Sequence, residues 1–532
     1  MNPDLSRRSF RLGVAGATAG VAAFLSAQLH AWPPHEDETL ALFVGHRPLG
    51  DLLDTVLGER GGAPLHFLLV HAVTAISPTL TGLRLISVAF AVASIPVVAA
   101  LVARLSDRMT ALVATVIVAA SWVTLFHGIY GRMYSLFLFT SALSFLALLR
   151  AIRRNDRSSW ALWALAAYAA LASHQYGAFV LGVQVAYVLA LRSRRKTTLL
   201  PAAFALAAVA AAAVPLWRSN LVLASRFDVG IGGGGKELGG PVPVLEYLRS
   251  ALGDFVAGWT GLFAVVAVVA AGGLVLLARN RPASALLAGL AFALPAAGLT
   301  IARVGGSASA PATRHLIFAL PFFALILAVG LLRLTQLAGP RAPAALALSV
   351  ASLVAAEIAW GWQTTPTLYA GEPPRREAAR EAAEAWLAGT SRPTDVLFGF
   401  DPLYLGARER GGAVGETVVP RADPRLALEA LEEAPKPLGR GVWVLDASDG
   451  SRIVSNWSWR LEIQDRSPGT AFETRAFGPF LIVRTVEPTT TPQAFLWDTL
   501  QVQRLGRTLW VGNADLNYQT ARLALDRLEE RS

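Results

Sequence analysis

The stretch GLRLISVAFAVASIPVVAALVA at residues 82–103, followed by Arg104 and Arg108, decides the fold class of this chain. An α-helix rises about 1.5 Å per residue, so a run of this length crosses the roughly 30 Å hydrocarbon core of a bilayer. The same pattern of an apolar run with basic ends recurs along the chain. It predicts a mainly α fold, a polytopic transmembrane helical bundle of about eleven spans. The predicted spans lie near residues 12–31, 82–103, 109–127, 133–150, 160–173, 175–191, 198–217, 258–278, 284–302, 314–332 and 343–362.

The composition supports the membrane class. Of the 532 residues, 54% are hydrophobic and 16% are charged, whereas a soluble protein usually carries about a quarter of charged residues. The net charge is +10, but the basic residues form short clusters between apolar runs, so we expect no nucleic-acid partner. Cysteine is absent, which excludes disulfides, thiolate metal sites and cysteine nucleophiles. Eight histidines offer little material for a multi-histidine metal centre.

The basic clusters also predict an orientation in the cell (inner, cytoplasmic) membrane. With the N-terminus in the cytoplasm, every inside loop carries arginine or lysine, as the positive-inside rule requires. The segments that then lie outside are residues 32–81, the turns near 128–132 and 174, the loop 218–257, the loop 303–313 and everything after 363. Arg7-Arg8 before the first apolar run imitates a twin-arginine export signal, but we favour an uncleaved first span because many spans follow.

The predicted external segments differ in character. The stretches 45–58 and 64–78 have apolar residues at helical spacing and are expected to form interfacial helices in the first external loop. We therefore expect a transmembrane domain at 1–362 and a small extracytoplasmic α/β domain at 363–532, with strands near 395–400, 441–447 and 477–486 and helices near 375–388, 422–433 and 515–530. The glycine-rich stretch 231–240 lacks the strand and helix of a phosphate loop, so a flexible loop is expected there.

Three consecutive acids, Glu36, Asp37 and Glu38, open the first external loop. A carboxylate at this position can act as a general base on an acceptor hydroxyl, while its neighbour orients it or holds a divalent cation. The alternative is a solvated acidic turn with no chemical role.

Five segments, in order, give the chain a resemblance to a known class. Asp37-Glu38 stand where that class has an Asp-Glu pair. GGAPLHFLLVHA at 61–72 is similar to its "H-P-P-L-Y-Y-L-L" segment, although Gly62 and Ala63 replace the usual His and first Pro. HGIYGRMYSLFLFTSALSFLALLRA at 127–151 looks like its "E-A-R-M-Y" segment, with Tyr130 in place of the acid, and the stretches 173–181 and 309–330 are similar to its "T-H-Y-F" and "P-R-Y-L-L-x-x-L-P" segments. Residues 10–362 therefore resemble the GT-C membrane glycosyltransferases, which include the protein O-mannosyltransferases and the bacterial aminoarabinose transferases.

The resemblance implies roles for particular residues. Asp37 would be the catalytic base and Glu38 its support, with Arg132 and Tyr134 near the donor phosphate. A guanidinium suits a phosphate, because it offers two parallel charge-assisted hydrogen bonds to the charge that a leaving phosphate accumulates. Snorkelling to the interface is the alternative for Arg132.

Other polar residues at the predicted outer ends of spans are weaker candidates for the donor site, each with an ordinary structural alternative. The turn residues could bind the donor sugar or form a plain hairpin, the Arg-His pair could contact phosphate or anchor the span, and the lysine could close over the donor. These candidates are His66, His174, Gln175, Tyr176, Lys236, Arg314 and His315.

The predicted reaction is transfer of a sugar from a polyprenyl-phosphate donor to an acceptor hydroxyl on the outer face. Inversion at the anomeric carbon and the monophosphate donor come from the resemblance. The partners expected are this donor and membrane lipids, with a protein, lipid or glycan acceptor, and no cofactor beyond an undecided divalent cation at Asp37 and Glu38. Two rivals stay open: a transporter of lipid-linked substrates, for which we find no internal repeat, and a non-catalytic membrane scaffold or sensor.

Overall fold

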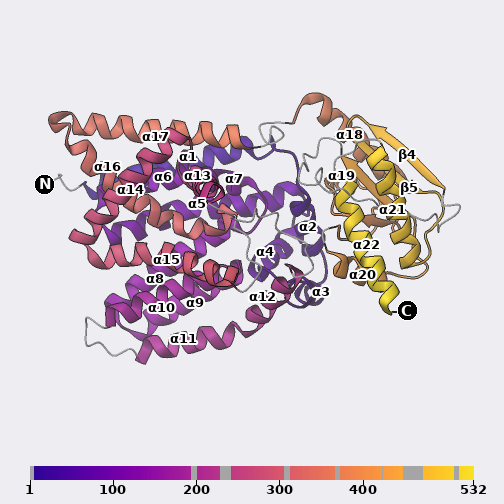
Figure 1. The fold of residues 1–532 in the computed structure, drawn as a ribbon, viewed down its shortest axis with the longest axis horizontal. Helices are drawn as coiled ribbons and strands as arrows, with labels where there is room; N and C mark the ends of the chain where they lie inside the picture. Colours follow the sequence, from indigo (N-terminus) through magenta and orange to yellow (C-terminus); the bar gives the residue numbers. More distant parts are fainter. Residues whose placement is uncertain are drawn as a thin grey trace. The chain divides into compact units, whose positions relative to one another are not determined.

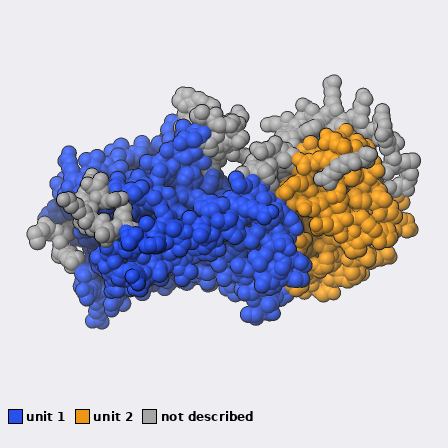
Figure 2. Space-filling view, turned by 90° about the horizontal axis from the view of Figure 1, so that it is seen from below, with its two compact units in different colours: residues 1–31, 48–223, 235–366 blue, residues 32–47, 224–234, 367–532 orange. Residues whose placement is uncertain are grey.

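The computed structural model describes residues 5–192, 200–227, 241–304, 312–365, 372–421, 423–446, 471–508 and 514–531. The chain divides into two compact units (Figure 2). Unit 1 comprises residues 1–31, 48–223 and 235–366, and unit 2 comprises residues 32–47, 224–234 and 367–532. Each unit is described in turn.

Unit 1 is a bundle of α-helices (Figure 1). They are α1 (Arg7–Gln28), α3 (Leu49–Asp54), α4 (Pro64–Thr74), α5 (Leu80–Leu105), α6 (Arg108–Ala120), α7 (Trp122–Ile129), α8 (Tyr134–Arg154), α9 (Arg157–Ser173), α10 (Gly177–Arg192), α11 (Leu200–Ala212), α12 (Val214–Phe227), α13 (Pro241–Phe255), α14 (Thr260–Asn280), α15 (Pro282–Val304), α16 (Leu320–Gln336) and α17 (Ala342–Thr364). A π-helix covers Thr55–Glu59, and 3-10 helices cover Thr313–Ala319 and Gly339–Arg341.

Each predicted span coincides with a helix or a bent pair of helices. Within the described residues, seven helices are long and apolar enough to cross a membrane, or up to nine if each bent pair counts as one span. The bent pairs are α6 with α7, at 51°, and α11 with α12, at 48°. Helices α9 and α10, with 17 and 16 residues, are shorter. The polytopic helical fold predicted from the apolar runs is confirmed.

Helix α16 belongs to the most buried of the candidate spans and packs against α6, α14 and α17. Its contact with α14 depends on two glycines. A Cβ on Gly273 would lie 1.9 Å from the carbonyl oxygen of Ile326, and a Cβ on Gly330 would lie 2.1 Å from that of Val269. Small residues that let two backbones approach are the usual basis of helix packing in membranes, where no hydrophobic force drives association.

A buried carboxylate holds the break between α6 and α7. Glu357 of α17 accepts hydrogen bonds from the backbone N–H of Trp122, at 2.6 Å, and from that of Ala257. The indole of Trp122 donates to Thr365, at 2.8 Å. Because Trp122 is the first residue of α7, its bond to Glu357 satisfies an amide that the bend leaves without a helical partner. The bond from Ala257 ties the segment between α13 and α14 to the same carboxylate.

Unit 2 is a layered α/β structure with the strands β1 (Val396–Phe398), β2 (Thr417–Val419), β3 (Gly441–Asp446), β4 (Phe472–Phe477) and β5 (Phe480–Thr485). The sheet order is β2-β1-β3-β5-β4; β2, β1 and β3 run parallel, and β5 is antiparallel to β3 and β4. Alternate strand residues face two cores. One core is covered by α20 (Pro424–Glu433), α21 (Pro492–Thr508) and α22 (Ala514–Arg531), and the other by α2 (Glu36–Gly45), α18 (Pro374–Thr390) and α19 (Pro402–Glu409).

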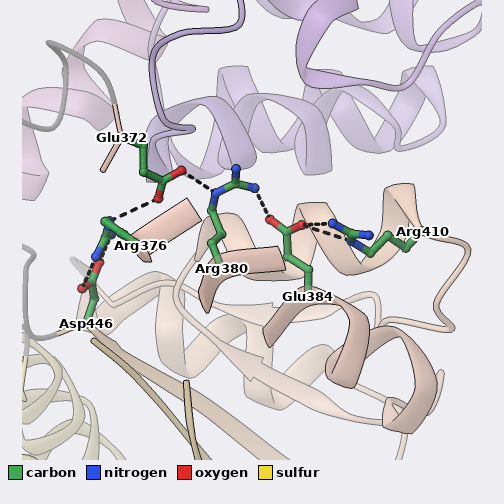
Figure 3. Close-up of polar contacts among 6 residues, drawn as sticks. All are labelled: Glu372, Arg376, Arg380, Glu384, Arg410 and Asp446. Atoms are coloured by element: carbon green, nitrogen blue, oxygen red, sulfur yellow. Dashed lines mark hydrogen bonds and ion pairs between the residues drawn. The ribbon is translucent and has the colours of Figure 1, made fainter. Parts of the chain in front are cut away.

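A chain of ion pairs follows α18 (Figure 3). Arg376 pairs with Asp446 at the end of β3, and Arg380 bridges Glu372 and Glu384. Glu384 also pairs with Arg410 at the end of α19, at 3.2 Å. These partly buried pairs fix α18 and α19 to the sheet, on the face that receives α2.

The sequence predicted three of the five strands, and it missed β2 and β4 as well as α19 and α21. The region 218–257, predicted as an external loop between spans, contains the end of α12 and the helix α13, neither of which the sequence analysis predicted there. The expected interfacial stretches are helical in the structure, as α3 with the π-helix and as α4. The acids at 36–38 form the first turn of α2, which belongs to unit 2.

Candidate functional site

The turn between α7 and α8 carries two candidate side chains of unit 1, Arg132 and Tyr134. The N–H of Arg132 donates to the carbonyl of Tyr130, at 2.6 Å, which closes the turn. Ser87 of α5 donates to the carbonyl oxygens of Tyr130 and Arg132, at 3.0 and 3.2 Å. These bonds pin the turn to α5 and deliver Tyr134 at the start of α8, where it is buried.

A second turn, between α9 and α10, presents His174. The Nδ1 of His174 accepts the N–H of Tyr176, at 3.1 Å, so a neutral imidazole here carries its proton on Nε2. The ring stacks on Phe137 with centroids 4.8 Å apart. Gly177 lets the chain turn closely, because a Cβ there would lie 2.5 Å from the carbonyl oxygen of Ala170. Gln175 is half-buried in the same turn.

The third segment is the 3-10 helix Thr313–Ala319, which carries Arg314 and His315. The Arg314 guanidinium carbon lies 5.4 Å from the centre of the Tyr134 ring. His315 stacks on Tyr134 with a centroid distance of 6.0 Å. It also lies 5.3 Å from His174 and 5.2 Å from Tyr176.

These contacts bring together residues far apart in the sequence. We call the group formed by His127, Tyr134, His174, Tyr176 and His315 the aromatic-histidine cluster. Arg314 lies beside this cluster, over the ring of Tyr134. All but His127 were candidates from the sequence.

His127 of α7 is the residue that the sequence analysis missed. Its ring centroid lies 4.6 Å from that of Tyr134, the shortest ring distance in the cluster. It is buried. A histidine at the end of a predicted apolar span is the sequence signal that could have identified it.

Burial and positive charge keep the imidazoles near the turns neutral. Burial, followed by the charges of His315, Arg132 and Arg314, lowers the pKa of His174 well below its ordinary value. Burial and the nearby Arg132 lower the pKa of His66, in α4, to about 3. Neutral imidazoles beside two arginines donate hydrogen bonds without adding charge, an arrangement suited to an anion.

Several buried nitrogen atoms of these arginine and histidine side chains have no hydrogen-bond partner among the described residues. These buried atoms are Nδ1 of His127, Nε of Arg314, Nδ1 of His315 and both ring nitrogens of His66. An unsatisfied buried polar group costs about 1–3 kcal/mol, and buried groups left in this state call for a ligand or a functional explanation.

The acids of α2 lie in unit 2. His35 caps the helix by accepting the N–H of Asp37 on Nδ1, at 3.1 Å, and Glu38 accepts the N–H of His35, also at 3.1 Å. Glu38 is fully buried, whereas the side chain of Asp37 is 37% exposed and its carboxylate lies 3.8 Å from Nδ1 of His35. Of these two acids, Asp37 is thus the more accessible to a substrate, and Glu38 stabilises the helix that carries it. A cation held by Asp37 and Glu38 stays a prediction.

Lys236 lies outside the described residues. The roles of Asp37, Arg132 and the other candidates remain predictions, although the structure brings five of the sequence candidates together with Arg132 near them.

No protein-family model matches the chain, and no curated protein sequence matches it. Among solved structures, the chain is similar to ArnT from Cupriavidus metallidurans in the apo state, with a TM-score of 0.53, 13% identity, and coverage of 88% of this chain and 97% of that one. It is also similar to the Archaeoglobus fulgidus oligosaccharyltransferase in complex with zinc and sulfate, with a TM-score of 0.49, 14% identity, and coverage of 81% and 68%. The likeness to ArnT, an aminoarabinose transferase, confirms the GT-C fold that the sequence resemblance predicted.

Proposed function

We propose, from the fold shared with the aminoarabinose transferase ArnT, that this protein is a membrane glycosyltransferase. It transfers a sugar from a polyprenyl-phosphate donor to an acceptor hydroxyl outside the cell. The protein lies in the cell membrane as a multi-pass protein with its N-terminus in the cytoplasm and residues 363–532 outside. This orientation rests on the basic loops.

The observation that supports the donor most directly is the convergence of Arg314 and His315 with Tyr134 and His174. The cluster offers positive charge, neutral hydrogen-bond donors and aromatic faces in one buried place. A lipid-linked phosphate sugar requires these features, since phosphate takes charged donors and a sugar ring packs on aromatic faces.

The proposed step is an in-line displacement. The acceptor oxygen forms a bond to the anomeric carbon as its proton passes to Asp37. The bond between that carbon and the phosphate oxygen breaks, and the polyprenyl phosphate departs with the electron pair. Arg132 and Arg314 stabilise the negative charge on the leaving phosphate. A single displacement inverts the anomeric configuration.

The test is sugar transfer by the purified, lipid-reconstituted chain from a panel of radiolabelled polyprenyl-phosphate sugars, with a cell-envelope fraction supplying acceptors. We expect Asp37→Asn to lower kcat by about 100-fold or more, because general-base catalysis contributes roughly that factor. Asp51→Asn, which changes an exposed acid of helix α3 in unit 1, is the matched control and should keep wild-type turnover.

Donor binding by the same preparations separates the roles. Arg132→Ala should weaken binding of the radiolabelled donor, while Asp37→Asn should bind it normally. Wild-type turnover in Asp37→Asn would remove the proposed base. Absence of transfer from every donor, in a folded wild-type protein, would favour the transporter or the scaffold.

A further inference from the structure

Helix α2, which carries the candidate base, is built into the core of unit 2. Phe43 is buried in the hydrophobic cluster of α18, α19 and the sheet. Its ring meets Phe400 edge-on with centroids 6.1 Å apart, and the guanidinium carbon of Arg408 lies 4.2 Å from its centre. Burial of an aromatic side chain stabilises a contact by about 2 kcal/mol or more, so α2 is docked at its C-terminal half.

A bidentate ion pair holds the other end of α2. Arg421 donates from Nε to both carboxylate oxygens of Glu36, at 3.0 Å each, and from Nη2 to one of them, at 2.6 Å. The N–H of Phe400 points to the same carboxylate, at 3.4 Å. The Arg421 side chain is 9% exposed. A bidentate pair of this kind specifies orientation as well as attraction.

The position of this pair in the sheet is informative. Phe400 and Arg421 follow the parallel strands β1 and β2, so both lie beyond the carboxyl ends of these strands. In α/β sheets that edge is the usual place for a ligand. Here the carboxylate of Glu36, which is far away in the sequence, occupies the position where a ligand usually binds.

Glu36 immediately precedes Asp37, so whatever fixes Glu36 also fixes the backbone of Asp37. The cap by His35 and Glu38 makes this first turn rigid. We propose that Arg421 is a positioning residue for Asp37: it acts through Glu36 and makes the C-terminal α/β structure a required part of the transferase. The inference rests on the proposed function for its effect on turnover, but the docking of α2 can be measured without it.

The kinetic test is a double-mutant cycle with Arg421→Gln, Glu36→Gln and the double variant. Neutral substitutions are used because Asp401 also lies near Arg421, and a reversed charge there would add repulsion. We expect each single change to lower kcat by up to about 100-fold, the loss that a misplacement of about 1 Å can cause, with KM for the donor within about twofold of wild type. The double variant should be no worse than either single variant, since both remove one interaction.

Three controls accompany the cycle. Arg421→Lys keeps a charge that can reach Glu36 and should restore part of kcat. Glu36→Gln changes only α2 and leaves the interior of the sheet intact, so it remains informative if Arg421→Gln folds poorly. Within α22, a guanidinium nitrogen of Arg522 lies 3.0 Å from a carboxylate oxygen of Asp526. Arg522→Gln removes this ion pair, which is also in unit 2, and should leave kcat unchanged.

A distance measurement tests the docking directly. The chain contains no cysteine, so spin labels can be placed on His46→Cys and Ala413→Cys, both exposed and both in unit 2. We expect a narrow distance distribution in the wild-type background that broadens in Glu36→Gln and Arg421→Gln and does not broaden in Arg522→Gln.

Each combined outcome has a distinct meaning. Broadened distances together with a lowered kcat support the proposal. Unchanged distances in both Gln variants overturn it, because Arg421 then does not hold α2. Broadened distances with wild-type kcat also overturn it, because the position of α2 then does not matter for turnover. An inactive wild type whose distances respond as expected would instead remove the proposed function and leave the docking of α2 established.

Discussion

Arg314 combines two properties that favour binding of an anion. Its guanidinium lies over the ring of Tyr134, and its buried Nε has no partner among the described residues. The aromatic face orients the planar group while its donors remain available. Arginine is more suitable here than lysine, because only a planar fork can stack and chelate a phosphate together.

We therefore expect Arg314→Gln to raise KM for the lipid-linked donor by about 10- to 100-fold, since a hydrogen bond to a charged group is worth roughly 1.5–3 kcal/mol. Initial-rate kinetics over a range of donor concentrations would measure this. Arg314→Lys should recover only part of the affinity. Equal KM in wild type and Arg314→Gln would show that the residue anchors the span and does not bind donor.

His127→Phe tests the residue that the sequence analysis missed. Phenylalanine keeps the ring beside Tyr134 but removes the imidazole nitrogens. If His127 donates to the donor phosphate or sugar, KM should rise by about tenfold, the value of one hydrogen bond of roughly 1.5 kcal/mol, with the unfolding temperature little changed. A fall in unfolding temperature with normal KM would mean that His127 serves packing alone.

At this scale, the sequence was informative where polar residues interrupt apolar runs. Tyr134, His174 and Arg314 lie at predicted outer ends of spans, so their proximity follows from topology. His127 is the last residue of the predicted span 109–127 and was missed because it was counted as part of that apolar run. The contacts of Glu36 and Glu38 were harder to predict. The partner of Glu36 lies 385 positions away in the sequence. The helix cap that uses Glu38 has a histidine where serine or threonine is usual.

Asp401 gives unit 2 a pH-dependent stability. It caps α19 by accepting the N–H of Leu403, at 2.9 Å, and burial raises its pKa from 3.8 to about 7 despite the opposing charge of Arg421. Between about pH 4 and 7, the unfolded chain releases a proton that the folded chain retains. Stability is therefore lost as the pH rises through this window, by up to about 4 kcal/mol.

Asp401→Asn keeps an acceptor for Leu403 and has no proton to lose. In thermal scans of the full chain, we expect the unfolding temperature of Asp401→Asn minus that of wild type to increase from pH 5 to pH 8. Asp423→Asn, at the cap of α20, controls for the loss of a capping charge. A difference between Asp401→Asn and wild type that does not vary with pH would contradict this account.

At the scale of elements, the break between α6 and α7 depends on Glu357. Replacing it with leucine leaves the amides of Trp122 and Ala257 without an acceptor in the bundle. We expect Glu357→Leu to destabilise the protein by roughly 2–6 kcal/mol, from about 1–3 kcal/mol for each unpaired donor, measured by thermal unfolding in detergent. Glu357→Gln retains one oxygen and should cost less. Equal unfolding temperatures for the two variants would argue against this role.

The helices could be predicted much better than the strands. A long apolar run carries its own signal, so every predicted span coincides with a helix or a bent pair. Strand β2 has only three residues, and its pairing with β1 is not local in the sequence. Helix α13 was missed because the glycine-rich stretch before it suggested one continuous loop.

At the scale of the whole molecule, the orientation can be tested because the chain has no cysteine. Ser158→Cys lies in the first turn of α9, and Glu433→Cys lies in unit 2; both sites are exposed. We expect a membrane-impermeant maleimide to label Glu433→Cys in intact spheroplasts, and Ser158→Cys only after permeabilisation. The reverse pattern would invert the proposed topology.

The assignment of residues 32–47 to unit 2 was not visible in the sequence. Residues 363–532 differ in composition from the apolar runs, so a separate α/β structure could be expected. Residues 32–47 show no such contrast, and their place in unit 2 depends on contacts of Phe43 and Glu36 with distant residues.

The docking of α2 also sets an order of events during synthesis. The ribosome makes α2 early, but Phe400 and Arg421 follow 364 and 385 positions later. At about 5–20 residues per second, the second interval lasts roughly 20–80 s. During this time the nascent chain can insert its spans, while Phe43 lacks the partners that bury it in the finished protein. The docking of α2 is therefore delayed until most of the chain has been made, and a prematurely terminated chain would reach the membrane with α2 undocked.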